Sequence, residues 1–166
     1  AWEDEAGMDV AVVMPNTEVT PKNRELGEAL KGNKRTLGCA LINPCTGEAA
    51  VKEIQAAIRD WGLRGMKLMP VIHKYNIDDP MVDAVMKAAR DLGIIVSIHS
   101  GPDNCHPTRI GNLAKRFPEI PVIMDHMGFP DNLPEAVEAA QQNKNISLGS
   151  TILRFQPHSF AVSSKK

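Results

Sequence analysis

The sequence contains six short runs of apolar or β-branched residues, with an amphipathic helix pattern between each run and the next. Such runs, typical of buried strands, begin near Val10, Thr36, Gly65, Ile94, Pro121 and Ile146. Successive starts lie 25 to 29 residues apart, which is close enough to call a period. Strands that are apolar at consecutive positions, each followed by such a helix, predict a parallel sheet covered by helices.

Helix patterns fill the intervals between these runs, and most of them carry recognisable boundary signals. The expected helices span 20–31, 47–61, 79–93, 108–117 and 133–142. The third is the clearest, because Asp79-Pro80 begins it and Gly93 ends it. Strand and helix therefore alternate along the chain.

Two folds satisfy this alternation, a doubly wound sheet and a (β/α) barrel. The near-constant period favours the barrel, in which every unit has the same geometric role. No Gly-x-Gly-x-x-Gly follows a strand, which argues against dinucleotide binding. We therefore predict an α/β fold of the (β/α)8 TIM-barrel type with about six of its eight units present. Residues 1–166 would form a single partial barrel domain that lacks the first and eighth strands.

Composition excludes several classes of partner. The 166 residues carry 19 Lys and Arg against 20 Asp and Glu, a formal net charge of −1, with the basic residues scattered. We expect no nucleic-acid partner, because nucleic-acid binding needs a basic patch. No apolar run approaches the roughly 18 residues of a membrane-spanning helix, and no signal-peptide pattern opens the chain. These features predict a cytoplasmic protein without a membrane partner.

The cysteines give little indication of chemistry. Cys39, Cys45 and Cys105 form an odd, sparse set without a Cys-x-x-Cys spacing. This pattern predicts reduced thiols instead of a disulfide framework or a cysteine-rich zinc site.

Polar residues mark the ends of the predicted strands, which is where the active sites of parallel barrels lie. They are Asn16, Asn43, Lys67, His99, Ser100, Asp125 and His126. His99 and His126 are 27 residues apart, one strand and helix unit, so we expect them on adjacent strands at one mouth. Two neutral imidazoles converging there can bind a divalent metal such as zinc, and a histidine beside the metal can act as a general base.

Strand alternation predicts which side chains enter the barrel. If His99 points inward, Ser97 and Ile95 do so too. The same count places His126, Met124 and Val122 inside and turns Asp125 away. We therefore predict His126 as the catalytic residue, with Asp125 supporting its surroundings.

Lys67 and Ser100 are predicted to contact the substrate. Lys67 lies between apolar residues, so its ammonium needs an anion or takes a lowered pKa. It could hold a substrate carboxylate, bridge metals if carboxylated, or pair with an acid at the barrel mouth. His73, His106 and His158 lie in predicted loops, where histidines are usually solvated. The loop containing His106 follows His99 and could close over the substrate.

Three segments together resemble a known family. WGLRGMKLMP at 61–70, LGIIVSIHSG at 92–101 and FPEIPVIMDHMG at 117–128 are similar to motifs of the amidohydrolase superfamily, in its amidohydrolase-related branch of metal-dependent TIM-barrel hydrolases and decarboxylases. The resemblance runs from about Gly7 to Leu148. It implies that His99 is the metal ligand of the fifth strand. It also implies that His126 is the histidine of the sixth strand, a ligand or a proton-transfer residue.

The sequence departs from that family at two points. The family has a His-x-His pair on its first strand and an Asp on its eighth, and neither is present here. We expect these 166 residues to be part of a longer enzyme and to be inactive alone. Homo-oligomerisation of this part through its open sheet edges is a further expectation.

The leading functional hypothesis is a metal-dependent hydrolase, with zinc as the expected metal. It would act on a C–N or C–O bond of a small carboxylated or cyclic substrate through a metal-activated water. A metal-dependent non-oxidative decarboxylase on the same fold is the second hypothesis, and a non-catalytic barrel fragment or interaction subunit is the third.

Overall fold

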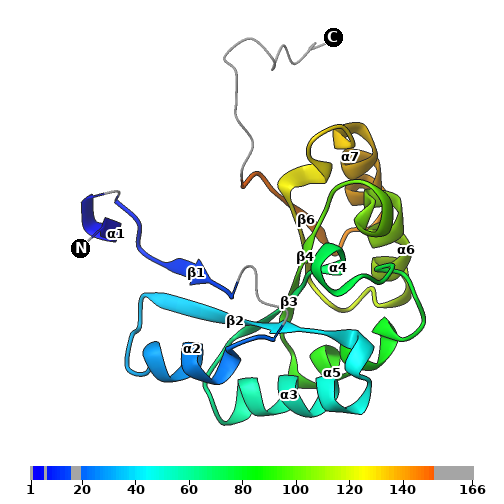
Figure 1. The fold of residues 1–166 in the computed structure, drawn as a ribbon. Helices are drawn as coiled ribbons and strands as arrows, with labels where there is room; N and C mark the ends of the chain where they lie inside the picture. Colours follow the sequence, from blue (N-terminus) through cyan, green and yellow to red (C-terminus); the bar gives the residue numbers. More distant parts are fainter. Residues whose placement is uncertain (1, 6, 16–19, 152–166) are drawn as a thin grey trace.

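A computed structural model describes residues 2–5, 7–15 and 20–151 of the chain. Its six strands form one sheet in the order β1-β2-β3-β4-β5-β6, and every neighbouring pair is parallel (Figure 1). The strands are β1 (Ala11–Val13), β2 (Thr36–Ile42), β3 (Gly65–Leu68), β4 (Ile95–His99), β5 (Val122–Asp125) and β6 (Ile146–Gly149). The predicted parallel sheet, with its strand order and starts, is confirmed.

Helices separate the strands as the period predicts. They are α1 (Trp2–Glu5), α2 (Asn23–Ala29), α3 (Glu48–Arg59), α4 (Pro70–His73), α5 (Val82–Leu92), α6 (Pro107–Arg116) and α7 (Leu133–Gln142). Three short 3-10 turns, η1 (Pro44–Thr46), η2 (Asp103–Cys105) and η3 (His126–Gly128), follow β2, β4 and β5. Gly93 ends α5 with a φ of 64°, a left-handed conformation that glycine adopts without steric cost.

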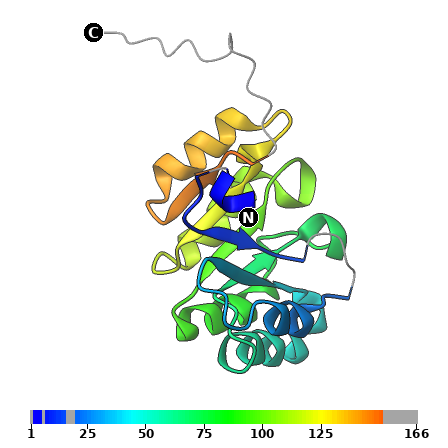
Figure 2. The same cartoon turned by 90° about the vertical axis from the view of Figure 1, so that its left-hand side faces the viewer.

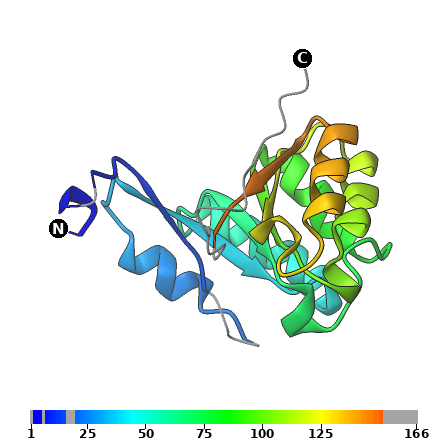
Figure 3. The same cartoon turned by 90° about the horizontal axis from the view of Figure 1, so that it is seen from above.

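The sheet curls, and the longer helices lie along its outer side, leaving the inner side free of long helices (Figure 3). In Figure 2, which is turned by 90° from Figure 1, β1 lies in front of the other strands, and α2 and α3 lie below it. This arrangement is a partial barrel of six strand and helix units. Within the described residues, no helix has both the length and the apolar character needed to cross a membrane.

The main core fills the space between the sheet and these helices. Alternate strand residues point into it, among them Met66, Ile98 and Met124, each with no exposed surface. From α5, Val82, Val85, Met86 and Ala89 pack against them. These helix residues recur at intervals of three and four, which places them on one face of the helix. The intervening strand residues face the inner side of the curl, where the candidate site lies.

Candidate active site

His99 and His126 come together at the carboxyl ends of adjacent strands. His99 is the last residue of β4, and His126 directly follows Asp125, the last residue of β5. Their ring centroids are 4.8 Å apart, with the rings inclined at 70° to each other. The prediction that both imidazoles lie at one mouth is confirmed. Their roles as metal ligand and catalytic residue remain predictions.

The surroundings of His99 keep its imidazole neutral. Burial, together with the nearby His126 and Lys67, lowers the pKa of His99 to about 4, although the Asp125 carboxylate acts in the opposite direction. A neutral imidazole offers a ring nitrogen lone pair, which a protonated ring lacks. At neutral pH, His99 is therefore in the protonation state that metal binding requires.

Thr151 orients the ring of His126. The His126 Nδ1 atom lies 3.0 Å from both the carbonyl oxygen and the hydroxyl oxygen of Thr151. A carbonyl oxygen only accepts hydrogen bonds, so the bond to it requires the proton on Nδ1. In the tautomer that carries this proton on Nδ1, the lone pair resides on Nε2, which is then free to bind a metal or to accept a proton.

An ion pair lies on the inner face beside the histidines. The Lys67 ammonium contacts the Asp125 carboxylate, and the two side chains are only 3% and 13% exposed. The Ser97 hydroxyl donates to Asp125 Oδ2 over 2.6 Å, and Lys67 Nζ donates to Ser97 Oγ over 3.3 Å. Burial lowers the pKa of Lys67, while the Asp125 carboxylate partly opposes this effect. The sequence left three roles for Lys67, and the structure shows one of them, the ion pair with an acidic residue at the barrel mouth, Asp125.

The predicted orientation of β5 is wrong. Asp125 points to the inner face toward Lys67, whereas Val122 and Met124 pack into the core on the helix side. Register explains the arrangement, because Asp125 lies directly across from His99 in the parallel ladder and shares its face.

The alternation rule failed at His126, because the chain has left the strand there. His126 has a φ of +66°, in the left-handed region, and begins the turn η3. This turn brings the His126 ring to the same mouth as Asp125, although the two residues are neighbours in sequence. The sequence signal available for the turn was the glycine at position 128.

Ser100 is buried behind the histidines. It has an exposed fraction of 1%, and its hydroxyl contacts only backbone groups among its recorded partners. The hydroxyl donates to the carbonyl oxygen of Asp125 and accepts from the amide of Gly128 over 2.7 Å. The predicted contact of Ser100 with substrate remains untested.

The other predicted polar positions have structural partners or lie elsewhere. The Asn43 side chain accepts from the Cys45 amide and begins η1. His106 caps α6 by accepting from the Thr108 amide. His73 was expected to be solvated, but it ends α4 and is only 8% exposed. Asn16 and His158 lie outside the described residues.

The donors at the mouth suit a divalent metal only in part. His99 and His126 supply two imidazoles, which fit zinc and similar ions. Across the described residues, no group of three or more His, Cys, Asp or Glu side chains is arranged to hold a metal ion. A catalytic zinc usually has three protein ligands, so two imidazoles alone would not complete such a site.

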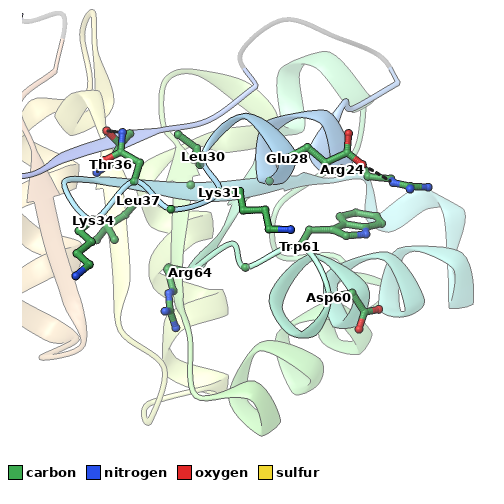
Figure 4. Close-up of a pocket in the computed structure, with 15 residues that line it drawn as sticks. Arg24, Glu28, Leu30, Lys31, Lys34, Thr36, Leu37, Asp60, Trp61 and Arg64 are labelled. Carbon is green, nitrogen blue, oxygen red and sulfur yellow. Dashed lines mark hydrogen bonds and ion pairs between the residues drawn. The ribbon is translucent and has the colours of Figure 1, made fainter.

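A cavity lies at the opposite end of the strands and is separate from this mouth. It has a volume of about 810 Å³ and is bordered by the beginnings of β2 and β3 (Figure 4). Its basic side chains include Lys31 and Lys34 beyond the carboxyl end of α2, and Arg64 beyond that of α3. Helix carboxyl ends favour nearby cations, which gives these charges a structural explanation.

Solved structures share this fold at low sequence identity. A TIM-barrel protein from Bordetella bronchiseptica superposes with a TM-score of 0.74 and 21% identity over 89% of this chain and 56% of its own. A manganese-bound 5-carboxyvanillate decarboxylase from Novosphingobium aromaticivorans gives 0.63 and 17%, over 84% of this chain and 49% of its own. A probable 2-pyrone-4,6-dicarboxylic acid hydrolase from Acinetobacter baumannii gives 0.57 and 16%, over 95% and 73%.

This chain thus spans about half the length of the first two proteins. No curated protein matches it significantly in sequence. The sequence profile of the Amidohydrolase family, by contrast, matches residues 3–159, nearly the whole chain. Together with the six parallel strands and the two histidines at their carboxyl ends, this match shows that the chain belongs to the amidohydrolase family.

Proposed function

We propose that this chain is part of a metal-dependent hydrolase that cleaves a C–N or C–O bond of a small carboxylated or cyclic substrate. The observation that carries the proposal is the pair of imidazoles 4.8 Å apart, one at the end of each of two neighbouring strands. Membership of the amidohydrolase family supports it. We propose a divalent metal, with zinc as the leading candidate and manganese, which a solved relative binds, as the other.

The two histidines take different roles in this proposal. His99 would hold the metal, because its imidazole is neutral and its strand fixes its position. A divalent metal, when bound, lowers the pKa of water so that the water can act as a nucleophile near neutral pH. His126 would accept the proton of that water on Nε2, in the tautomer that donates from Nδ1 to the carbonyl oxygen of Thr151.

Lys67 supplies the positive charge of the inner face. Its pairing with Asp125 offsets part of the cost of burying the ammonium. A substrate carboxylate that reached this group would share it with Asp125, so we propose that Lys67 attracts and orients the substrate through charge. Ser97, bonded to the same carboxylate, holds the pair in place.

A non-oxidative decarboxylase is the second candidate. The similarity of fold to 5-carboxyvanillate decarboxylase favours it. In that reaction Lys67 would face the carboxylate that departs as carbon dioxide. We further propose a cytoplasmic location and a small molecule as the partner. The three cysteines, all of which are free thiols, are consistent with that location.

The test combines metal analysis with product analysis. The longer enzyme to which these residues are expected to belong would be incubated with zinc or manganese, and 2-pyrone-4,6-dicarboxylate and 5-carboxyvanillate would be supplied as probes. Ring opening without carbon dioxide supports the hydrolase, whereas release of carbon dioxide supports the decarboxylase. His99→Ala should lower the metal content. His106→Asn, which removes an imidazole that caps α6 but leaves a residue able to cap, is the matched control. Equal metal content in both variants would contradict the assignment.

A further inference from the structure

The turn that carries His126 has an unusual backbone. His126, Met127 and Gly128 have φ values of 66°, 48° and 76°, three left-handed residues in succession. Only glycine adopts this region without steric cost, so the first two residues need an outside interaction to stay there. The position of the His126 ring depends on this turn, because its backbone, and not the strand, sets the direction of the side chain.

Ser100 supplies such an interaction from the neighbouring strand. Its hydroxyl donates to the carbonyl oxygen of Asp125, just before the turn, and accepts from the amide of Gly128, at its end. The buried hydroxyl oxygen of Ser100, the residue that follows His99, therefore forms hydrogen bonds to both ends of the turn.

Two glycines allow close packing around this turn. A side-chain carbon placed on Gly101 would lie 3.1 Å from the carbonyl oxygen of Phe129. A side-chain carbon placed on Gly128 would lie 2.9 Å from Pro107 Cγ. Glycine at position 101 therefore allows the end of β4 to approach the segment after β5, and glycine at position 128 allows the turn to approach the start of α6.

We propose that Ser100 is a positioning residue that sets the place of His126 relative to His99. This role differs from the substrate contact predicted for Ser100. The single proton of its hydroxyl is already donated to Asp125, and its side chain is buried. The consequence of this positioning for catalysis rests on the function proposed above, whereas the effect of Ser100 on the position of His126 does not.

The experiment uses the full chain without metal or substrate. Ser100→Ala and Ser100→Cys remove or weaken the hydroxyl, and Ser100→Thr retains it. Ser97→Ala is the matched control. Ser97 is a buried serine of β4 that also bonds to Asp125, but it bonds to the carboxylate, whereas Ser100 bonds to the backbone carbonyl. Hydrogen exchange of the Gly128 amide and the nuclear Overhauser contact between the rings of His99 and His126 are measured by NMR.

We expect the Gly128 amide to exchange about 5- to 10-fold faster in Ser100→Ala, as expected for the loss of one hydrogen bond. The contact between the two rings should weaken in the same variant. Ser100→Thr should restore both signals, and Ser97→Ala should leave the exchange of Gly128 within about twofold of the parent. If Ser100→Ala does not fold, the same two measurements are made on Ser100→Cys.

Unchanged exchange and an unchanged ring contact in the variants lacking the hydroxyl would overturn the proposal. An equal effect of Ser97→Ala would do the same. On a substrate identified by the product analysis, Ser100→Ala should lower kcat and leave KM nearly unchanged, whereas a substrate-binding role would raise KM. Failure to find any turnover would count against the proposed function alone, because the NMR measurements require none.

Discussion

The two faces of the sheet differ completely in chemistry. On the helix side, Met66, Ile98 and Met124 have no exposed surface and belong to the main core. On the inner side, the residues next to them in sequence are Lys67, His99 and Asp125, which form ion pairs and ring contacts. One strand therefore contributes to stability through one set of residues and to chemistry through the alternate set. Substitutions on the two faces should separate these effects.

The largest effect should come from His126. If this residue transfers the proton, His126→Ala should lower turnover about 10²- to 10⁴-fold, the usual cost of losing a general acid or base. Metal content should fall less than in His99→Ala. The free energy of unfolding should change little, because the ring is partly exposed. Turnover would be measured under saturating substrate, with His106→Asn as the control. Full activity in His126→Ala would remove this residue from the mechanism.

The next effect tests the buried charges of the inner face. Asp125→Ala leaves the Lys67 ammonium buried without its partner, and we expect a loss of about 3–5 kcal/mol in the free energy of unfolding. The double variant Lys67→Met with Asp125→Leu should recover most of this loss, because apolar residues of similar size often replace a buried pair at little cost. Urea denaturation measures both. A single variant as stable as the parent would show that the pair is not coupled to folding.

Ile98 provides the opposite case on the helix side. Ile98→Ala should cost about 2–5 kcal/mol of stability, because the side chain is fully buried in the core. The contact between the rings of His99 and His126 should persist in the folded fraction, since Ile98 points away from it. NMR at low denaturant compares the ring contact, and urea denaturation gives the stability. Loss of the ring contact in a folded Ile98→Ala variant would mean that the two faces are not independent.

The smallest effect concerns His73 and the pH dependence of stability. Burial lowers the pKa of His73 below its ordinary 6.5, so the unfolded chain takes up its proton at a higher pH than the folded protein does. The stability linked to the neutral ring is present above about pH 6.5 and is lost as the pH falls from there toward the lower folded pKa. His73→Phe should keep the stacking on Tyr75 and stay within about 1 kcal/mol of the parent at pH 8.

Between pH 8 and pH 5 the His73→Phe variant should lose less stability than the parent, as measured by urea denaturation at each pH. His99, whose pKa lies at about 4, titrates in both proteins and cancels in the comparison. Parallel stability curves for the two proteins would show that His73 does not contribute to the acid dependence.

Much of the fold could be predicted from the sequence. The spacing of Val10, Thr36, Gly65, Ile94, Pro121 and Ile146 predicted six strands, and all six lie in one parallel sheet in that order. The period was sufficient because each unit buries its apolar face against its sequence neighbours, a local requirement that leaves a local pattern. The approach of His99 and His126 followed from the same spacing, since residues one unit apart end on adjacent strands.

The details of the site depended on tertiary structure. Counting alternate residues placed Met124 inside and Asp125 outside, whereas the register of β5 against β4 sets Asp125 beside His99 and within reach of Lys67. Counting also assumed that the strand continues to His126, although the left-handed turn begins there. That turn is held by the Ser100 hydroxyl, 28 positions before Gly128. A periodic pattern reflects what each segment buries, but a hydrogen bond between segments distant in sequence leaves no period, so only the folded chain reveals it.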